Sequence, residues 1–216
     1  MTSRAPHRRR EPVQGLVLLA SIVALMWIVE AINALDGNGL NTDGIYARNL
    51  DRLWGIFTAP FLHAGWPHLI DNTIPFVFMG VIIALRGAVR LALVTVIVIV
   101  LGGLGTWLIA PGNTSTIGAS GIVFGYATYL LTRGLFDRSW LEILVGVVVG
   151  VIWGGALASS LVPHYGVSWQ AHAGGAVAGV IAAAILARPR TKSKPGSAGP
   201  TDAMGRALAW DPSRGR

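Results

Sequence analysis

Long apolar runs alternate with short polar segments along most of the chain. A helix needs roughly 20 mainly apolar residues to cross a bilayer, and each of six runs reaches or approaches that length. The runs cover residues 13–35, 68–85, 91–110, 118–132, 140–162 and 170–187, the fourth being the shortest. This pattern predicts an all-α, polytopic membrane protein built as a bundle of six transmembrane helices.

The segments outside these runs predict two tails and one long loop. We expect residues 1–12 to form a basic N-terminal tail and residues 13–187 to form one six-span domain. Residues 188–216 are rich in Pro, Gly, Ser, Lys and Arg, so we expect a disordered tail. Residues 36–67 contain several aromatic side chains, which suit a position at the membrane interface.

The first run also has features of a signal peptide, because Arg8, Arg9 and Arg10 precede it. However, the run is long, contains Glu30 and is not followed by a clear cleavage site with small residues. We therefore expect a retained span. The side chain of Glu30 is expected to be buried and hydrogen-bonded rather than to serve as a catalytic acid.

Composition agrees with a membrane protein. Hydrophobic residues make up 53% of the chain and charged residues only 12%, against about 25% charged in ordinary soluble domains. The chain has no cysteine, which excludes disulfides, zinc bound by cysteine and a thiol nucleophile.

The basic residues predict the orientation. All but two of the 17 Lys and Arg residues lie in the tails or in the loops after the second and fourth runs; Arg48 and Arg52 lie on the other side. By the positive-inside rule, both termini are expected in the cytoplasm, with the bacterial plasma membrane as the host. This bias accounts for the formal net charge of +7. No basic patch is interleaved with aromatic residues, so nucleic-acid binding is not indicated.

Polar residues within apolar spans are costly and are candidates for function. The second run opens with His68, Asp71 and Asn72, the fourth with Ser120, and the sixth with His172. In the predicted orientation all three runs start at the external side. Their polar side chains therefore meet at one depth, near the outer face of the bundle.

These residue types suit acyl transfer. A serine hydroxyl is a weak nucleophile that needs an adjacent base, and histidine is the natural base near neutral pH. His68 and Asn72, spaced i and i+4, share a helix face and can act with the Ser120 N–H as donors to an oxyanion. No acid is placed to complete a triad, since Asp71 lies off that face. We expect a Ser120–His172 dyad.

Small residues predict how the two catalytic helices meet. Gly175 and Gly179 follow His172, and Gly121 and Gly125 follow Ser120. Such residues allow the backbones of two helices to approach closely in a membrane. This approach would bring Ser120 within reach of His172.

The chain resembles the rhomboid family of intramembrane proteases in three motifs that occur in order. They are H-x-x-x-x-H-x-x-x-N at His63, His68 and Asn72, G-x-S-G at Gly118, Ser120 and Gly121, and A-H-x-x-G at Ala171, His172 and Gly175, with Gly179 one turn later. The resemblance covers residues 53–187. It implies a six-span bundle with the dyad in a water-filled cavity open to the outside.

The resemblance also implies roles for these residues. Ser120 is the nucleophile, His172 the base, and Asn72, His68 and the Ser120 backbone form the oxyanion hole. Phe124 takes the place of an aromatic residue that packs on the catalytic histidine, and His63 is structural. The partners would be transmembrane protein substrates in the lipid bilayer, with no metal or other cofactor.

The sequence departs from the family in two places outside the motifs. Trp54-Gly55 stands where Trp-Arg is common in the first external loop, which affects the bonding that stiffens this loop. A motif containing Glu after the second span is absent, and Arg86 alone remains.

Three other functions are less consistent with the sequence. A catalytically silent rhomboid-like protein that binds transmembrane helices usually lacks the Ser or the His, and both are present here. A transporter tends to have repeated halves with broken helices, which this chain lacks. His63 and His68 are accompanied by neither H-E-x-x-H nor clustered carboxylates, so a metal site is not indicated.

Overall fold

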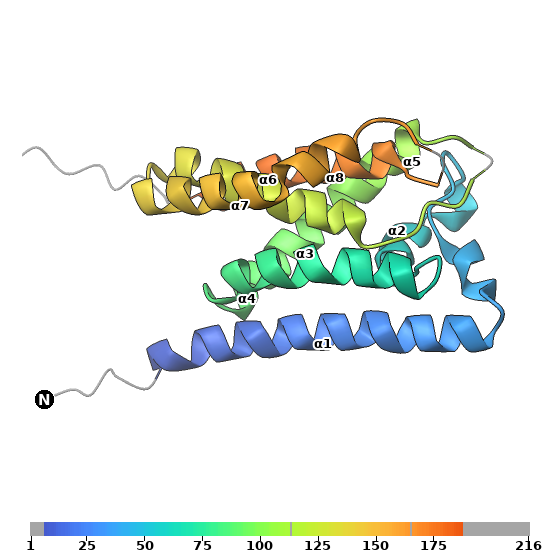
Figure 1. Ribbon diagram of the computed structural model, residues 1–216, viewed down its shortest axis with the longest axis horizontal. Helices are drawn as coiled ribbons and strands as arrows, with labels where there is room; N and C mark the ends of the chain where they lie inside the picture. Colours follow the sequence, from blue (N-terminus) through green and yellow to red (C-terminus); the bar gives the residue numbers. More distant parts are fainter. Residues whose placement is uncertain (1–6, 113, 165, 188–216) are drawn as a thin grey trace, which may run out of the picture.

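The structure is a computed structural model that describes residues 7–112, 114–164 and 166–187, and nearly all regular structure in that part of the chain is helical. Long helices run roughly along the length of the bundle (Figure 1). They are α1 (His7–Leu35), α3 (Trp66–Ala84), α6 (Ser120–Asp137), α7 (Trp140–Ser159) and α8 (Trp169–Ile185). Between α3 and α6 the chain forms α4 (Ala88–Ile97), η4 (Val98–Gly102) and α5 (Gly103–Ile109). The segments α4, η4 and α5 form one continuous helix with a π-helical turn in the middle.

The loop between α1 and α3 carries four short helices. They are η1 (Gly39–Asp43), η2 (Leu50–Arg52), α2 (Gly55–Thr58) and η3 (Ala59–Phe61). We call the end of the bundle that bears this loop the long-loop end, and the opposite end, where Arg86 and Arg133 lie, the basic end. Helices α3, α6 and α8 all begin at the long-loop end (Figure 1).

The structure describes only part of the two predicted tails. Helix α1 begins at His7, so it includes part of the stretch expected to be a basic tail. The tail predicted over residues 188–216 lies outside the described residues.

Four helices are long and apolar enough to cross a membrane. They are Glu11–Leu35, Trp66–Ala84, Ala88–Ile109 and Trp140–Ser159. Helix α8 is apolar but shorter, and α6, which carries Arg133 and Asp137, is not among these four helices. The chain is therefore a helical bundle with several apolar spans, and the count of six stays a prediction.

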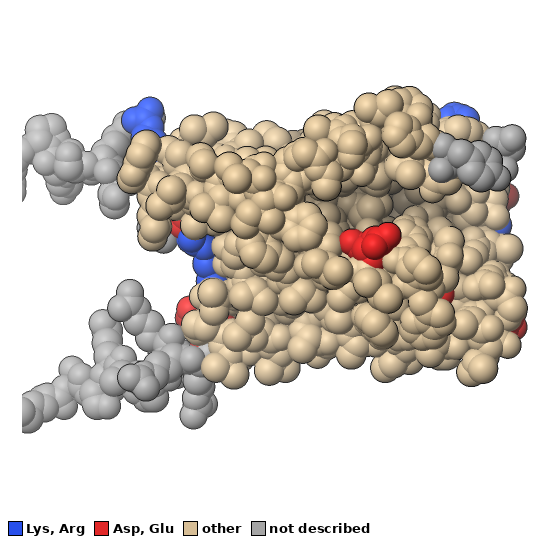
Figure 2. All heavy atoms as spheres, in the orientation of Figure 1, with Lys and Arg blue, Asp and Glu red and all other residues tan. Residues whose placement is uncertain are grey.

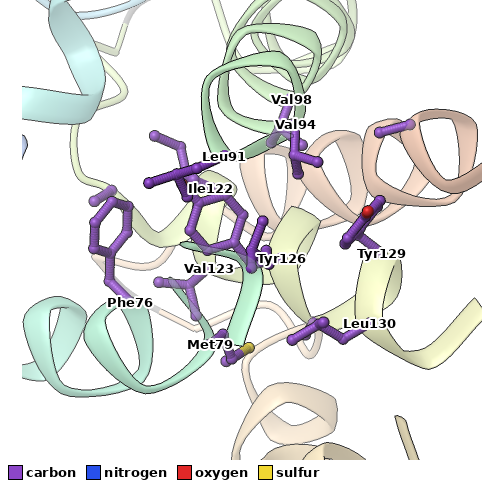
Figure 3. Close-up of a cluster of buried hydrophobic side chains, with 14 of the residues drawn as sticks. Phe76, Met79, Leu91, Val94, Val98, Ile122, Val123, Tyr126, Tyr129 and Leu130 are labelled. Atoms are coloured by element: carbon purple, nitrogen blue, oxygen red, sulfur yellow. The ribbon is translucent and has the colours of Figure 1, made fainter. Parts of the chain in front are cut away.

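Helix α6 is the centre of the bundle, which explains its lower need for apolar surface. It packs against α3, α7, α8 and η4. Its inward side chains Val123, Tyr126 and Leu130 join Phe76 and Met79 of α3 in the main core (Figure 3). The rings of Phe76 and Tyr126 stack at 5.3 Å, and the Tyr126 hydroxyl shares a 2.6 Å hydrogen bond with that of Thr95.

Apolar side chains cover the outside of the bundle. Val151 of α7, for example, is 79% exposed. Figure 2 shows a largely uncharged face with most charged atoms near the two ends. Such a surface suits a lipid environment, since soluble proteins rarely expose apolar patches of this size.

Candidate active site

The backbone just ahead of Ser120 is held by the long loop. Gly118 has a φ of 112°, a conformation that residues with a side chain rarely adopt. Its N–H donates to the carbonyl of Ala59 at 2.9 Å, and the Ala119 N–H donates to Nε2 of His63 at 3.4 Å. Ser120 then begins α6, half-buried. These bonds fix the position of the backbone from which the Ser120 side chain extends.

Two polar side chains of α3 lie against this turn. A Cβ built on Gly118 would be 2.8 Å from Cε1 of His68 and 3.5 Å from Nδ2 of Asn72. Glycine at residue 118 is therefore needed for this close approach as well as for its φ. Nδ1 of His68 accepts the Ala64 N–H at 3.2 Å, which assigns the ring proton to Nε2. His68 thus presents a donor beside the Gly118 turn.

Asn72 presents a second donor at the same place. Its side chain is only 6% exposed, and its Nδ2 is buried without a hydrogen-bond partner among the described residues. Buried donors are nearly always paired. An unpaired donor therefore lies next to the turn that leads into Ser120.

The side chain of His172, on α8, is oriented by two contacts with other parts of the chain. Its Nδ1 lies 2.8 Å from the carbonyl oxygen of Ser160, which can only accept, so Nδ1 carries the proton and Nε2 is left as a base. The ring stacks on Phe124 with centroids 4.3 Å apart and planes 8° from parallel. Both contacts restrict the imidazole to one tautomer and one plane.

Glycines bring α6 and α8 into backbone contact. A Cβ on Gly175 would lie 2.0 Å from the Gly121 oxygen, and one on Gly179 would lie 2.1 Å from the Gly125 oxygen. The close approach expected from these four glycines is present. Because Ser120 sits one turn before Phe124, it lies on the side of α6 that faces His172. No hydrogen bond joins Ser120 to His172 within the described residues, and such bonds are often long before substrate binds.

His63 is a structural neighbour of this site. It is fully buried, and its ring meets that of His68 edge to face at 5.2 Å. Burial lowers the pKa of His63 to about 4, so the ring is neutral near pH 7. A neutral ring can accept the Ala119 N–H, as the geometry requires.

Buried polar groups of α1 support the same loop. Glu30 and Asn33 are both fully buried. The side-chain amide of Asn33 donates to Glu30 at 3.3 Å and to the His63 carbonyl at 3.2 Å. Glu30 is therefore a buried hydrogen-bonding residue, as expected from the sequence.

A family comparison agrees with this geometry. A profile of the Rhomboid domain matches residues 50–189. The chain belongs to the rhomboid family. An uncharacterized protein of Mycobacterium tuberculosis is 44% identical over 89% of this chain and 83% of its own length. Rhomboid-like protein 11, chloroplastic, of Arabidopsis thaliana is 28% identical over 86% of this chain and 69% of its own. Rhomboid protease GluP of Bacillus subtilis is 24% identical over 88% of this chain and 38% of its own.

In this rhomboid the long loop is stiffened without the Trp-Arg pair. The Arg52 guanidinium lies 4.6 Å from the ring centroid of Tyr46 and 5.5 Å from that of Trp54, and it pairs with Asp43 at 3.6 Å. Gly55 itself is required by packing, since a Cβ there would be 2.2 Å from the Gly44 oxygen. Arg52 therefore contributes to holding this loop together.

Arg86 also has a partner that sequence reasoning missed. It forms an ion pair with Glu142 of α7, which also lies 3.8 Å from Arg133 of α6. Arg133 pairs in turn with Asp137 at 3.0 Å. A carboxylate from α7 therefore pairs with Arg86 in this chain. A lone acid at the start of an apolar run was the signal in the sequence.

The described residues contain no group of three or more His, Cys, Asp or Glu side chains that could hold a metal ion. His164 is exposed in the loop before α8.

Proposed function

We propose that this rhomboid is an intramembrane serine endopeptidase that cuts transmembrane segments of other membrane proteins with a Ser120–His172 dyad. The observation that carries the proposal is the convergence of three helices on one turn. It is supported by two contacts on either side of Ser120: Nδ2 of Asn72 adjoins Gly118, and the His172 ring stacks on Phe124.

The chemical steps follow from these groups. Nε2 of His172 takes the Ser120 proton as the hydroxyl oxygen attacks the carbonyl carbon of the scissile bond. The oxyanion that forms is stabilised by Nδ2–H of Asn72, Nε2–H of His68 and the Ser120 N–H. The imidazolium then gives its proton to the leaving amine, and a water activated by His172 releases the acyl group. The Ser160 carbonyl takes the orienting place that an acid fills in a triad.

The setting of this reaction is also part of the proposal. Six spans would place both termini in the cytoplasm and the Ser120 turn near the external face, because Lys and Arg gather at the basic end and in the tails. A cavity of about 40 Å³ adjoins Gly118 and Gly121, on either side of Ser120. The Bacillus subtilis relative is named a rhomboid protease.

The test is cleavage of a generic transmembrane substrate by the purified protein in lipid vesicles. Ser120→Ala and His172→Ala should each abolish cleavage, while a chelator should leave it unchanged. Asn72→Ala should lower kcat by about 10²–10³, the usual effect of losing one oxyanion donor. Ser21→Ala, at an exposed residue of α1, is the matched control and should cleave normally.

A second candidate makes the opposite prediction. A silent helix-binding rhomboid would bind the same substrates, cut none of them and fail to react with a serine-directed probe. That result with several substrates would remove the catalytic assignments and leave the fold.

A further inference from the structure

Asp71 is an exposed carboxylate on a helix that is apolar enough to span a membrane. It is the only acid of α3, and its side chain faces outward from the bundle. Figure 2 shows acidic atoms over α3, beside a hollow in the surface and far from the charges at either end. Within the described residues Asp71 has no ion pair and no side-chain hydrogen bond. A charge in this position is costly, so it calls for a reason.

Asp71 lies at the depth of the candidate active site. It stands between His68 and Asn72, which both approach Gly118. It is close enough to His68 for its charge to act there. The Nδ2 of Asn72, next along the chain, is buried and unpaired. Asp71 is thus the charged group at the edge of a site that still has an unfilled polar position.

The neighbouring part of α7 leaves room beside this face of α3. The buried residues of α7 are Glu142, Gly146 and Val149, all in its half toward the basic end. In the other half, a Cβ on Gly154 or Gly155 would meet no atom within 4 Å. Phe78 and Trp153 form a ring contact across the space between α3 and α7 at 6.1 Å. A substrate segment that reaches Ser120 from this side passes Asp71.

Substrate binding changes the surroundings of this carboxylate. Water in the hollow can hydrate Asp71 while the site is empty. A substrate segment displaces part of that water, and an ionised carboxylate stripped of water is strongly destabilised unless it is paired. A basic side chain on the substrate restores a partner, an apolar one does not, and an acidic one adds repulsion. Asp71 therefore both favours one class of substrate and disfavours others.

We propose that Asp71 is a specificity-determining residue that selects transmembrane segments carrying Lys or Arg close to the scissile bond. The inference rests on the proposed protease function and adds the substrate class. A charge-assisted hydrogen bond in a partly desolvated site changes kcat/KM by about tenfold or more. Arg and Lys both reach water from an apolar segment near the membrane surface, which makes them compatible with a transmembrane substrate.

The experiment scans charge along one substrate whose cut site has been mapped. Lys, Leu and Glu are placed in turn at each of the four positions on either side of the scissile bond. The value of kcat/KM is measured for the parent protein in lipid vesicles. At one or two positions Lys should be cut about tenfold faster than Leu, and Glu more slowly than Leu.

Variants of the enzyme assign this preference to Asp71. Asp71→Asn should abolish the preference for Lys over Leu at those positions. Asp71→Lys should reverse the charge preference, so that Glu is cut faster than Lys. Asp71→Glu should retain it. Asp51→Asn is the matched control, because Asp51 is an exposed acid on the same end of the bundle within the long loop. Its ratio should equal that of the parent.

The outcomes separate the two proposals. If the parent cuts the reference substrate but the scan is flat, or if Asp71→Asn keeps the Lys preference, the role of Asp71 is wrong and the protease function stands. If the parent cuts no substrate, both fall. Should the Asp71 variants fail to fold, the scan with the parent still decides whether a basic preference exists.

Discussion

The glycines at the α6–α8 contact and those in the second half of α7 have opposite surroundings. On α6, Gly121 and Gly125 touch the backbone of α8 so closely that a Cβ on Gly175 or Gly179 would meet an oxygen at about 2 Å. On α7, Gly154 has no atom within 4 Å of a Cβ built there. The α6–α8 pair is locked by backbone contact, whereas the second half of α7 has no fully buried residue, and its Trp153 and Leu157 are only partly buried against the core.

This difference follows the division of work in the candidate site. The helices that carry Ser120 and His172 cannot shift without breaking backbone contacts, so the spacing of the two side chains is fixed. Helix α7 is instead tied at the basic end by Glu142 and remains loosely packed beside α3. The groups proposed for catalysis therefore stand on tightly packed helices, whereas the half of α7 beside the proposed substrate route is packed more loosely.

The largest expected effect comes from a Gly→Ala substitution at the α6–α8 contact, compared with the same substitution on α7. Gly175→Ala should destabilise the protein by about 3 kcal/mol or more and abolish cleavage, because only backbone could move to admit the methyl group. Gly154→Ala should be neutral or stabilising by up to about 1 kcal/mol, since it removes a flexible residue from a helix. Thermal unfolding in detergent and cleavage in vesicles measure both. Equal behaviour of the two variants would contradict the contrast between α6 and α7.

The next effect concerns the ionic contact that ties α7 to its neighbours. Glu142→Gln leaves Arg133 buried with one partner fewer and Arg86 without its pair. Removing one member of a buried ion pair costs about 3–5 kcal/mol, and we expect the lower end because Asp137 still pairs with Arg133.

Asp43→Asn serves as the control for Glu142→Gln. It removes an ion pair with Arg52 in which both side chains are partly exposed. It should therefore change the free energy of unfolding by less than about 1 kcal/mol. If both variants lose the same stability, the cluster at the basic end does not anchor α7.

Side-chain chemistry was more predictable from the sequence than the bonds that orient it. The apolar runs indicated the helical bundle, and the glycines indicated the α6–α8 contact. Both features can be seen in a short stretch of sequence, because they depend only on the hydrophobicity and size of neighbouring residues. The hydrogen bonds that the carbonyl oxygens of Ser160 and Ala59 accept were missed. Backbone groups are the same at every residue, so no sequence pattern marks which carbonyl will face His172 or Gly118.

Long-range pairing limited the prediction in the same way. The resemblance identified Arg86 as a residue without its usual acid, but Glu142 lies on another helix and only the fold brings them together. Likewise, the low apolar content of α6 reflects its central position rather than a shorter path across the bundle. A residue's surroundings, unlike its type, depend on every other helix.

A moderate effect is expected from pH at the buried His63. An unfolded His63 takes up a proton near pH 6.5, whereas the folded ring does so only near its lowered pKa of about 4. Stability should therefore be constant above pH 6.5 and fall as pH drops toward 4, by about 2–3 kcal/mol from this group. In His63→Asn that loss should shrink, even if the variant starts less stable. Thermal unfolding between pH 4 and 7.5 compares their slopes, and an unchanged slope would mean that His63 titrates normally.

The smallest expected effect tests the loose side of the bundle. The contact between Phe78 and Trp153 at 6.1 Å is a ring contact between α3 and α7, and Phe78 is 37% exposed. Phe78→Leu keeps an apolar side chain and should cost less than about 1 kcal/mol, because a partly exposed ring contact contributes only about that much. If substrate passes between these helices, the same change should raise kcat/KM by about two- to fivefold without altering the position of the cut. Ile70→Leu, at an exposed residue elsewhere on α3, is the control. A rise in both variants, or in neither, would indicate that this contact does not limit substrate access.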